Sequence, residues 1–212
     1  MSIIPGTLIS HRSRDIAVQV LNGHFATRHS HVNYYIDLTQ AKYRLSMARE
    51  VASELAVRYI STSVDTIICM EGTKMIGAFM ADELSRQGIM MLNRGNDINV
   101  ISPELDNGGQ IIFRENNISM VRDRSVLLLA SSVSTGETVN RTLDCLRYYG
   151  GSLTGICALF CIKPEIYGYH VNAVFKHDDI PDYRSFHSED CVMCAKKQKL
   201  DGIINAFGYS RL

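Results

Sequence analysis

The spacing of apolar residues alternates along the chain between the periods of a helix and of a strand. From residue 41 to 60, apolar side chains recur every three or four positions, while charged side chains, Lys42 among them, lie largely elsewhere around the predicted helix. Residues 64–70 are a short apolar run rich in β-branched side chains, which predicts a strand buried on both faces. The helical spacing returns over residues 73–87, and Gly88 stands where a helix would end.

The second half of the chain repeats this order. Residues 125–130 predict a core strand, a turn rich in Ser, Thr and Gly follows, and apolar residues at 139, 143, 146 and 149 predict a helix. Two glycines end that helix, and residues 153–161 return as a strand. Strands that alternate with single helices pair in parallel through right-handed crossovers. The expected fold class is therefore α/β, with a doubly wound, mostly parallel sheet.

The middle of the chain is patterned less clearly. Residues 89–92 predict a further strand. Residues 98–101 and 110–113 flank Pro103 and the sequence Asn-Gly-Gly at 107–109, as in a hairpin or a flexible loop.

Composition narrows the class of protein. The 212 residues are 46% hydrophobic and 21% charged, which supports one substantial core and excludes disorder and coiled coil. The formal net charge of zero removes the simplest case for nucleic-acid binding, which needs a basic face. No apolar run approaches the roughly 20 residues that cross a bilayer, and the N-terminus lacks the pattern of a secretory signal. We expect a cytoplasmic protein with no nucleic-acid or membrane partner.

Two loops stand where ligands bind in an open parallel sheet, at the carboxyl ends of strands that run into helices. The first is residues 70–74 and the second is residues 130–138. In the second loop, Gly136 permits close backbone approach, and the hydroxyls of Ser134, Thr135 and Thr138 stand beside the unpaired N–H groups of a helix start. Such a start favours a phosphate monoester. A capping motif in which Ser134 or Thr135 closes the helix and nothing binds explains the same residues.

Together these segments resemble the type I phosphoribosyltransferases, and most closely the orotate phosphoribosyltransferases. The family's hallmark is an apolar run, two acids, two further residues and T-T-G-x-[ST]; here it reads VLLLASSVSTGET at 126–138. Gly23-His24-Phe25 and Tyr34-Tyr35-Ile36-Asp37 resemble the N-terminal G-x-F and Y-Y-I-D element of the orotate enzymes. The resemblance spans roughly residues 20–210. It implies one domain over residues 1–212, with an N-terminal hood element (1–40), a core sheet carrying the ligand loops (41–165), and a C-terminal strand and helix (166–212).

The resemblance also implies roles for individual residues. The 5′-phosphate of phosphoribosyl pyrophosphate (PRPP) would be held by Ser134, Thr135, Gly136, Glu137 and Thr138, and pyrophosphate would face Glu71, Gly72, Thr73 and Lys74. A lysine at a helix start is most often a solvated surface side chain, and that role explains Lys74 as well. The positions of the ribose-binding acid pair are taken by Ala130 and Ser131, so both carboxylates are missing. Mg²⁺ would accompany PRPP if that ligand is bound.

Two further segments depart from the orotate enzymes. The loop that carries a basic cluster in that family here spans residues 101–110, with Glu104, Asp106 and no Lys or Arg. Acids there oppose the stabilisation of a leaving pyrophosphate, and Arg94 and Arg114 flank the loop. The T-S-G segment of the orotate-binding element is replaced near residues 28–30, so the nucleobase cannot be inferred.

The chain's cysteines and histidines admit more than one interpretation. The six cysteines are expected to be reduced thiols. Cys191 and Cys194, with His187 and His177 upstream, resemble half of a zinc site, but one C-x-x-C is weak evidence and an ordinary reduced pair is the favoured interpretation. His24, His29 and His31 are interpreted as a solvated face or a subunit contact rather than a metal cluster.

Three functions follow from these patterns. The first is a Mg²⁺- and PRPP-dependent transferase that attaches a nucleobase, orotate by resemblance, to ribose 5-phosphate. The second is a non-catalytic protein that binds or senses a nucleotide or sugar phosphate. The third is a structural homodimer with merely capped loops. The missing acids and basic loop favour phosphate-ester binding over turnover, and a homodimer is expected in each case.

Overall fold

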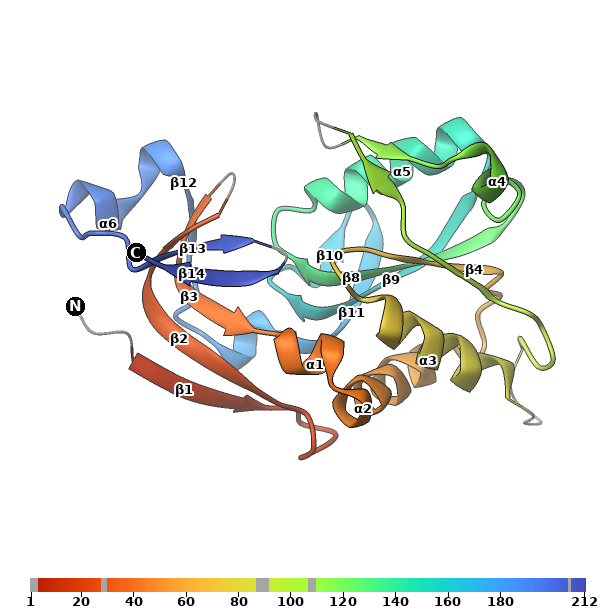
Figure 1. The fold of residues 1–212 in the computed structure, drawn as a ribbon, viewed down its shortest axis with the longest axis horizontal. Coiled ribbons are helices and arrows are strands. Elements are labelled where there is room, and N and C mark those ends of the chain that lie inside the picture. Colours follow the sequence, from red (N-terminus) through yellow and green to blue (C-terminus); the bar gives the residue numbers. More distant parts are fainter. Residues whose placement is uncertain (1–3, 28–29, 87–91, 107–109, 206) are drawn as a thin grey trace.

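The central sheet is parallel along most of its width, as the sequence predicts (Figure 1). A computed structural model describes residues 4–27, 30–86, 92–106, 110–205 and 207–212. The six strands of this sheet lie in the order β10-β11-β9-β8-β4-β5, and only β10 pairs antiparallel to its neighbour. Their bounds are β4 Thr66–Cys69, β5 Asn99–Ile101, β8 Ser125–Val133, β9 Ser152–Cys161, β10 Glu165–Ile166 and β11 Tyr169–Lys176.

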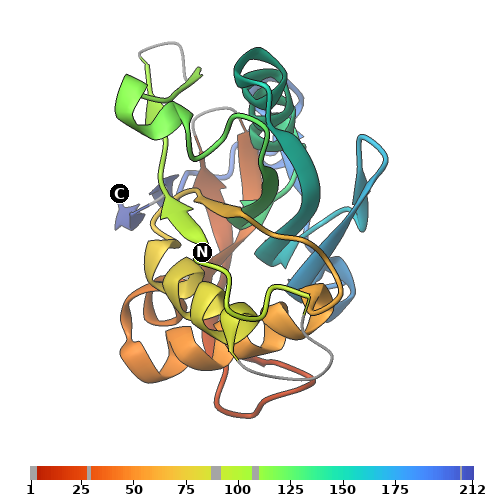
Figure 2. The same ribbon diagram turned by 90° about the vertical axis from the view of Figure 1, so that its right-hand side faces the viewer.

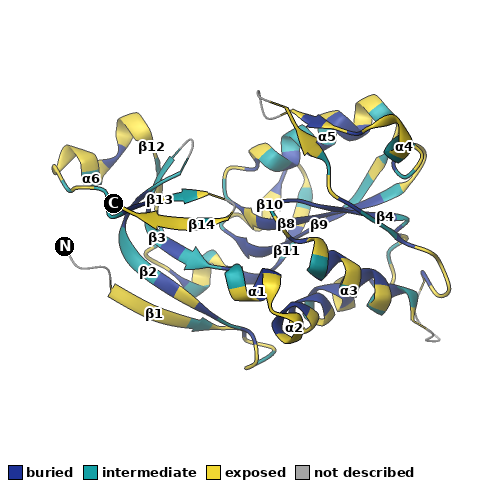
Figure 3. Cartoon of the chain, viewed as in Figure 1, coloured by how far each residue is buried: buried dark blue, intermediate teal, exposed yellow. Residues whose placement is uncertain are grey.

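Helices cover both faces of the central sheet (Figure 2). On one face α2 (Leu45–Ala56) and α3 (Lys74–Ser85) pack with Leu127 and Leu129, and on the other α5 (Glu137–Tyr149) packs with Leu128. This alternation along β8 is the two-residue period of a strand, so the middle of the central strands is apolar on both sides and buried (Figure 3). The doubly wound α/β class is confirmed.

Two predicted boundaries are wrong. The helix expected over residues 41–60 is broken at Arg44, whose extended backbone separates α1 (Thr39–Tyr43) from α2, and a 3₁₀ turn, η1 (Val57–Tyr59), follows α2. Strand β8 continues three residues beyond Ala130 because its polar serines still pair with β9 as far as Val133. Ala130 and Ser131 therefore belong to a strand and not to a loop.

In the middle region a smaller hairpin takes the place of the expected one. Residues 99–101 pair in parallel with β4, so they extend the central sheet and do not form a hairpin with residues 110–113. The hairpin is smaller, formed by β6 (Glu104–Leu105) and β7 (Ile111–Ile112), and a short helix α4 (Glu115–Ile118) follows. Gly88, the predicted strand up to residue 91 and the Asn-Gly-Gly turn lie outside the described residues.

A second six-stranded sheet is built from both ends of the chain. The N-terminal part supplies β1 (Ile4–Ile9), β2 (Ala17–Ala26) and β3 (Ser30–Asp37), and the C-terminal part supplies β12 (Ser185–His187), β13 (Gly202–Asn205) and β14 (Gly208–Arg211). Three short helical turns, η2 (His177–Asp179), η3 (Ser188–Asp190) and α6 (Val192–Ala195), lie in the connecting segments. The expected N-terminal hood element is thus joined by C-terminal strands, and from here on we call the whole second sheet the hood. Figure 1 shows it beside the central sheet. Among the described residues, no helix has both the length and the apolar character to cross a membrane.

Candidate functional site

The two loops singled out in the sequence lie side by side, at the carboxyl ends of two neighbouring strands of the central sheet. Strands β4 and β8 are parallel neighbours, with Cys69 opposite Leu129. The N–H of Met70 donates to the Leu129 carbonyl at 2.8 Å, so the pairing continues to the point where the first loop begins. The chain then turns into α3 after one strand and into α5 after the other. We call this place, formed by residues 70–74 and 130–138, the loop site.

The turn after β8 places a glycine, and so no capping side chain, at the N-cap position of α5. Gly136 is the N-cap residue, with a left-handed backbone (φ 89°), and no capping side-chain hydrogen bond is formed. The hydroxyl of Thr135 is a distant acceptor, 3.4 Å from the Glu137 nitrogen. A Cβ on residue 136 would lie 2.7 Å from Cγ2 of Ile166, so both backbone and space require glycine here. The capping alternative is met only by this weak contact between the Thr135 hydroxyl and the Glu137 N–H, and a phosphate bound at this helix start would compete with it.

The other residues of this turn carry either hydroxyl groups or, in Glu137, a carboxylate. Thr135 is exposed, and Ser134 and Thr138 are half-buried, so residues with hydroxyl groups lie on both sides of Gly136 in the sequence of the turn. The carboxylate of Glu137 instead accepts a hydrogen bond from Arg141, one turn along the same helix, at 2.5 Å. This ion pair neutralises an acid that would otherwise repel a bound anion.

The loop after β4 is shaped by two residues with left-handed backbones, Glu71 (φ 54°) and Gly72 (φ 81°). Thr73 is completely buried, and its hydroxyl donates to the Met70 carbonyl at 2.7 Å, with the Leu129 carbonyl at 3.2 Å. The Thr73 side chain therefore holds the loop against β8. Lys74, the first residue of α3, is exposed.

The carboxylate of Glu71 reaches across to the other strand. Its Oε2 accepts a hydrogen bond from the Ser132 N–H at 3.4 Å. Burial raises the pKa of Glu71, and the N–H groups of Ser132 and Ser131 and the charge of Lys42 act in the opposite direction. This carboxylate stands beside the strand positions from which the family's acid pair is missing.

Lys42 contacts the loop site, which its sequence position did not reveal. It was expected on the charged side of a long helix; it is instead buried, only 4% exposed. The break at Arg44 gives α1 its own orientation, and Lys42 Nζ donates to the Glu71 carbonyl at 3.4 Å. Burial lowers the pKa of Lys42, opposed by the charges of Glu71 and Asp37.

The donor set does not fit a resident magnesium ion. Mg²⁺ in proteins is held by one or two carboxylates together with substrate phosphates. Ala130 and Ser131 are buried in β8 and offer no carboxylate. Glu137 is paired with Arg141, and Glu71 is engaged by backbone N–H groups. Mg²⁺ bound to this chain would have to arrive with its phosphate ligand.

The segments that depart from the orotate enzymes supply little positive charge. Arg114 binds Glu104 through three hydrogen bonds of 2.6, 3.0 and 3.1 Å, so the acid of the hairpin neutralises it. Arg94 is exposed. Residues 28 and 29 of the replaced T-S-G segment lie outside the described residues, and Ser30 is hydrogen-bonded to Thr27 at the start of β3.

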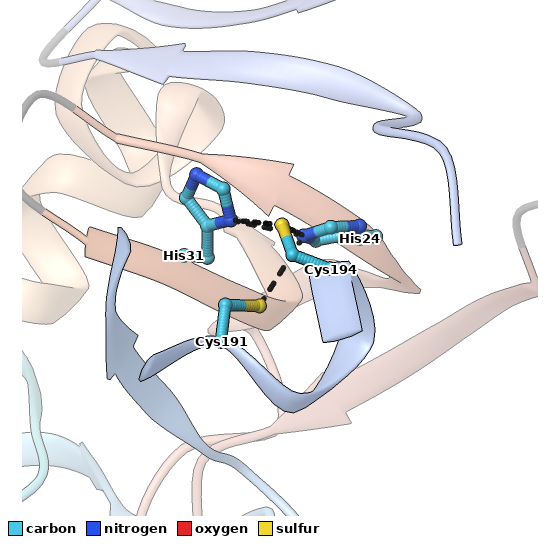
Figure 4. A group of neighbouring side chains, drawn as sticks. All are labelled: His24, His31, Cys191 and Cys194. Atoms are coloured by element: carbon cyan, nitrogen blue, oxygen red, sulfur yellow. Dashed lines mark hydrogen bonds between the residues drawn. The ribbon is translucent and has the colours of Figure 1, made fainter. Parts of the chain in front are cut away.

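A second constellation lies in the hood, where His24 and His31 meet Cys191 and Cys194 (Figure 4). The prediction that His24 lies on a solvated face is wrong, because its side chain is completely buried. His187 is exposed on β12 and His177 lies beside Asp178, so neither histidine proposed from spacing joins the cysteines. His29 lies outside the described residues. The signal available in the sequence was the pair of histidines on two successive strands.

Comparison with known proteins supports the fold. No family model matches the chain, and no curated protein does. Solved structures do, among them orotate phosphoribosyltransferase of Mycobacterium tuberculosis in complex with PRPP (14% identity, TM-score 0.51, 69% of this chain and 82% of that one). Adenine phosphoribosyltransferase of Thermoanaerobacter pseudethanolicus matches at 14% identity and TM-score 0.52, over 68% of this chain and 88% of that one.

UMP synthase of Leishmania donovani shares 22% identity at a TM-score of 0.50, over 70% of this chain. The matched region is only 31% of that longer protein. At these identities the likeness establishes architecture. The chain has the type I phosphoribosyltransferase fold, which confirms the fold that the sequence resemblance implied.

Proposed function

We propose that the chain binds a 5′-phosphoribosyl ligand, PRPP or a nucleoside monophosphate, at the loop site. The observation that carries the proposal is the start of α5, where the N-cap residue Gly136 has a left-handed backbone and offers no capping side chain. This helix start lies at the carboxyl end of a central parallel strand, where open α/β sheets bind their ligands. A solved structure with the same fold contains PRPP.

The 5′-phosphate would be held by backbone and hydroxyl groups. The first-turn N–H groups of α5 carry the positive end of the helix dipole, roughly half an elementary charge. The hydroxyls of Ser134, Thr135 and Thr138 add donors around the same point. Because Gly136 has no Cβ, the turn can take the left-handed backbone from which α5 starts while Ile166 packs against it. A neutral protein can hold a doubly charged ester in this way without a basic patch.

Ribose would be held less firmly than in an enzyme with two acids. Charge-assisted hydrogen bonds to a diol contribute about 1.5–3 kcal/mol each, and Ala130 and Ser131 supply none from a carboxylate. Glu71 is the carboxylate next to these positions and would be the acceptor for a ribose hydroxyl. It must then exchange its contact with the Ser132 N–H for one with the sugar.

We favour binding or sensing of the phosphoribosyl ligand over its transfer. Transfer requires stabilisation of charge on a leaving pyrophosphate, whereas Arg114 is already paired with Glu104. Transfer to a nucleobase such as orotate is the second candidate, and Lys74 supports it. This lysine is an exposed cation at the start of α3, in the loop next to the phosphate-binding turn.

Calorimetric titration tests the proposal, with ribose 5-phosphate, orotidine monophosphate and PRPP with Mg²⁺ as separate ligands. We expect Thr135→Val to weaken all three, because each would lose the same hydroxyl contact to the 5′-phosphate. Thr7→Val, on the exposed strand β1, is the matched control and should bind as the unaltered protein does. Failure of all three ligands to bind, or equal binding by Thr135→Val, would overturn the proposal.

A pyrophosphate-release assay separates the two candidates. PRPP binding without release in the presence of orotate or another nucleobase supports a binding protein. Release that depends on both PRPP and a base, and that Lys74→Gln abolishes, supports the transferase.

A further inference from the structure

Four potential metal ligands from the two ends of the chain converge in the hood. His24 comes from β2, at a point where the register with β3 shifts between Asn22 and Phe25, and His31 comes from β3. Cys191 is the N-cap residue of the short helix α6, and Cys194 lies within that helix. The four ligand atoms all lie within 4.8 Å of one another (Figure 4). A register shift of this kind changes the direction in which a side chain leaves the strand, and His24 lies within the shifted part of β2.

Four of the six separations between the ligand atoms are close to those of a tetrahedral zinc shell. Zinc bonds of about 2.3 Å to sulfur and 2.0–2.1 Å to nitrogen give tetrahedron edges of about 3.3–3.8 Å. The nitrogen atoms of His24 and His31 are 3.1 Å apart, and Cys194 Sγ is 3.3 Å from His31 Nδ1 and 3.7 Å from His24 Nε2. Cys191 Sγ is 3.5 Å from the same His24 nitrogen. All six separations lie within 4.8 Å, so small shifts of the side chains would bring the four atoms around one cation.

The buried histidine is oriented as a ligand. His24 Nδ1 is 3.0 Å from the backbone carbonyl of Gln198, which can only accept a hydrogen bond. The proton therefore belongs on Nδ1, and the lone pair of Nε2 points into the cluster. A carbonyl that fixes the tautomer of a histidine in this way is a recurrent feature of zinc sites.

The segment around the cysteines has almost no apolar core of its own. From residue 188 to 200, all of which the structure describes, Cys191 is the one buried residue. Helix α6 has four residues, and Val192 is half exposed. Hydrogen bonds between His24 and Asp201, at 2.7 and 2.8 Å, join the end of this segment to β2. A segment that buries so little needs another source of stability, which metal ligation supplies in small folds.

We propose that His24 Nε2, His31 Nδ1, Cys191 Sγ and Cys194 Sγ bind one Zn²⁺ in a closed tetrahedral site. Two thiolates would neutralise the charge of the ion. With four protein ligands and no open position, the site is structural and clamps the C-terminal segment onto β2 and β3. Soft sulfur together with imidazole in tetrahedral geometry selects zinc over Mg²⁺, so this site is independent of the loop site.

Metal analysis and Co²⁺ titration of the full chain test the proposal. We expect about one zinc per chain in protein purified without chelator. Protein that has been chelated and reduced should take up one equivalent of Co²⁺, with the visible absorption of tetrahedral Co²⁺ and a thiolate charge-transfer band. In Cys194→Ser and His31→Ala, Co²⁺ affinity should fall at least tenfold. His187→Ala is the matched control, since His187 is an exposed histidine on the strand next to β3, and should behave as the unaltered chain.

The zinc content and Co²⁺ spectrum of the unaltered protein test the proposal even if a variant fails to fold. Absence of zinc together with absence of tetrahedral Co²⁺ absorption would overturn the proposal. A tetrahedral Co²⁺ spectrum that persists in both Cys194→Ser and His31→Ala would also overturn it, because the ion would then lie elsewhere.

Discussion

Glu71 Oε2 accepts a hydrogen bond from the backbone N–H of Ser132 at 3.4 Å, which joins the loop after β4 to the end of β8. The contact places one carboxylate beside two strand positions, 130 and 131, that carry none. Burial raises the pKa of this carboxyl above its ordinary value, so the folded chain holds the proton to a higher pH than the unfolded chain does. The contribution of Glu71 to stability is therefore present at low pH and lost as pH rises through the raised pKa.

The first prediction concerns this pH dependence. Glu71→Gln keeps the size of the side chain and removes its ionisation, so the free energy of unfolding should fall less between pH 4, below the ordinary pKa of a Glu carboxyl, and pH 7 than in the unaltered chain. Urea unfolding at the two pH values measures the difference. Glu189→Gln, at an exposed position in η3, is the control. A pH dependence unchanged by Glu71→Gln would contradict the burial argument.

The second prediction concerns the turn before α5. Gly136→Ala places a Cβ 2.7 Å from Ile166 in a left-handed backbone, so the turn must shift. We expect ribose 5-phosphate to bind at least about tenfold more weakly, equivalent to about 1.4 kcal/mol. Gly95→Ala is the control: its φ is 74°, and no atom lies within 4 Å of the added Cβ. Both variants bear a backbone strain of about 1–3 kcal/mol, so only a loss of binding confined to Gly136→Ala agrees with the account.

The third prediction separates a structural threonine from a binding one. Thr73→Val removes a buried hydroxyl that donates to the Met70 carbonyl, with the Leu129 carbonyl close by, and should destabilise the chain by about 1–3 kcal/mol. Thr135→Val removes an exposed hydroxyl and should change stability by less than about 0.5 kcal/mol. Equilibrium unfolding compares the two directly. The reverse order of the two effects would show that the loop is not held by Thr73.

The fourth prediction tests how η1 is anchored to the sheet. The Tyr59 hydroxyl donates to the Ile156 carbonyl at 2.6 Å and accepts from the Asn172 amide at 3.0 Å, within the core. Tyr59→Phe leaves both groups short of a partner and should cost about 1–3 kcal/mol of unfolding free energy. Tyr148→Phe, on an 83% exposed tyrosine, should be neutral. A neutral Tyr59→Phe would mean that water replaces the hydroxyl.

The parts of the fold that repeat a simple period were predictable from sequence. The runs at 64–70, 125–130 and 153–161 are mostly apolar, and turns that contain Gly or Ser follow the first two. The end of β8 was not predictable, because Ser131 and Ser132 look like a turn until their pairing with β9 is seen. The break at Arg44 was equally hidden, since no glycine or proline marks it.

Within the candidate sites, the positions of the two loops were predictable from sequence, whereas the roles of Lys42 and His24 were not. The two loops follow from strand order, since parallel neighbours end at one edge. Lys42 and His24 owe their roles to partners far away in sequence: Glu71 in one case, Gln198 and the cysteines in the other. Local spacing carries no record of such contacts, and so a charged face and a solvated strand were the natural but incorrect interpretations.

The crystal structure of the chain soaked with ribose 5-phosphate is the measurement that bears most directly on the central claim. We predict the phosphate at the start of α5, with its oxygens within hydrogen-bond distance of the Glu137 and Thr138 N–H groups and the Thr135 hydroxyl. A turn closed by its own side chains, or a phosphate bound elsewhere, would contradict the account and leave only the architecture.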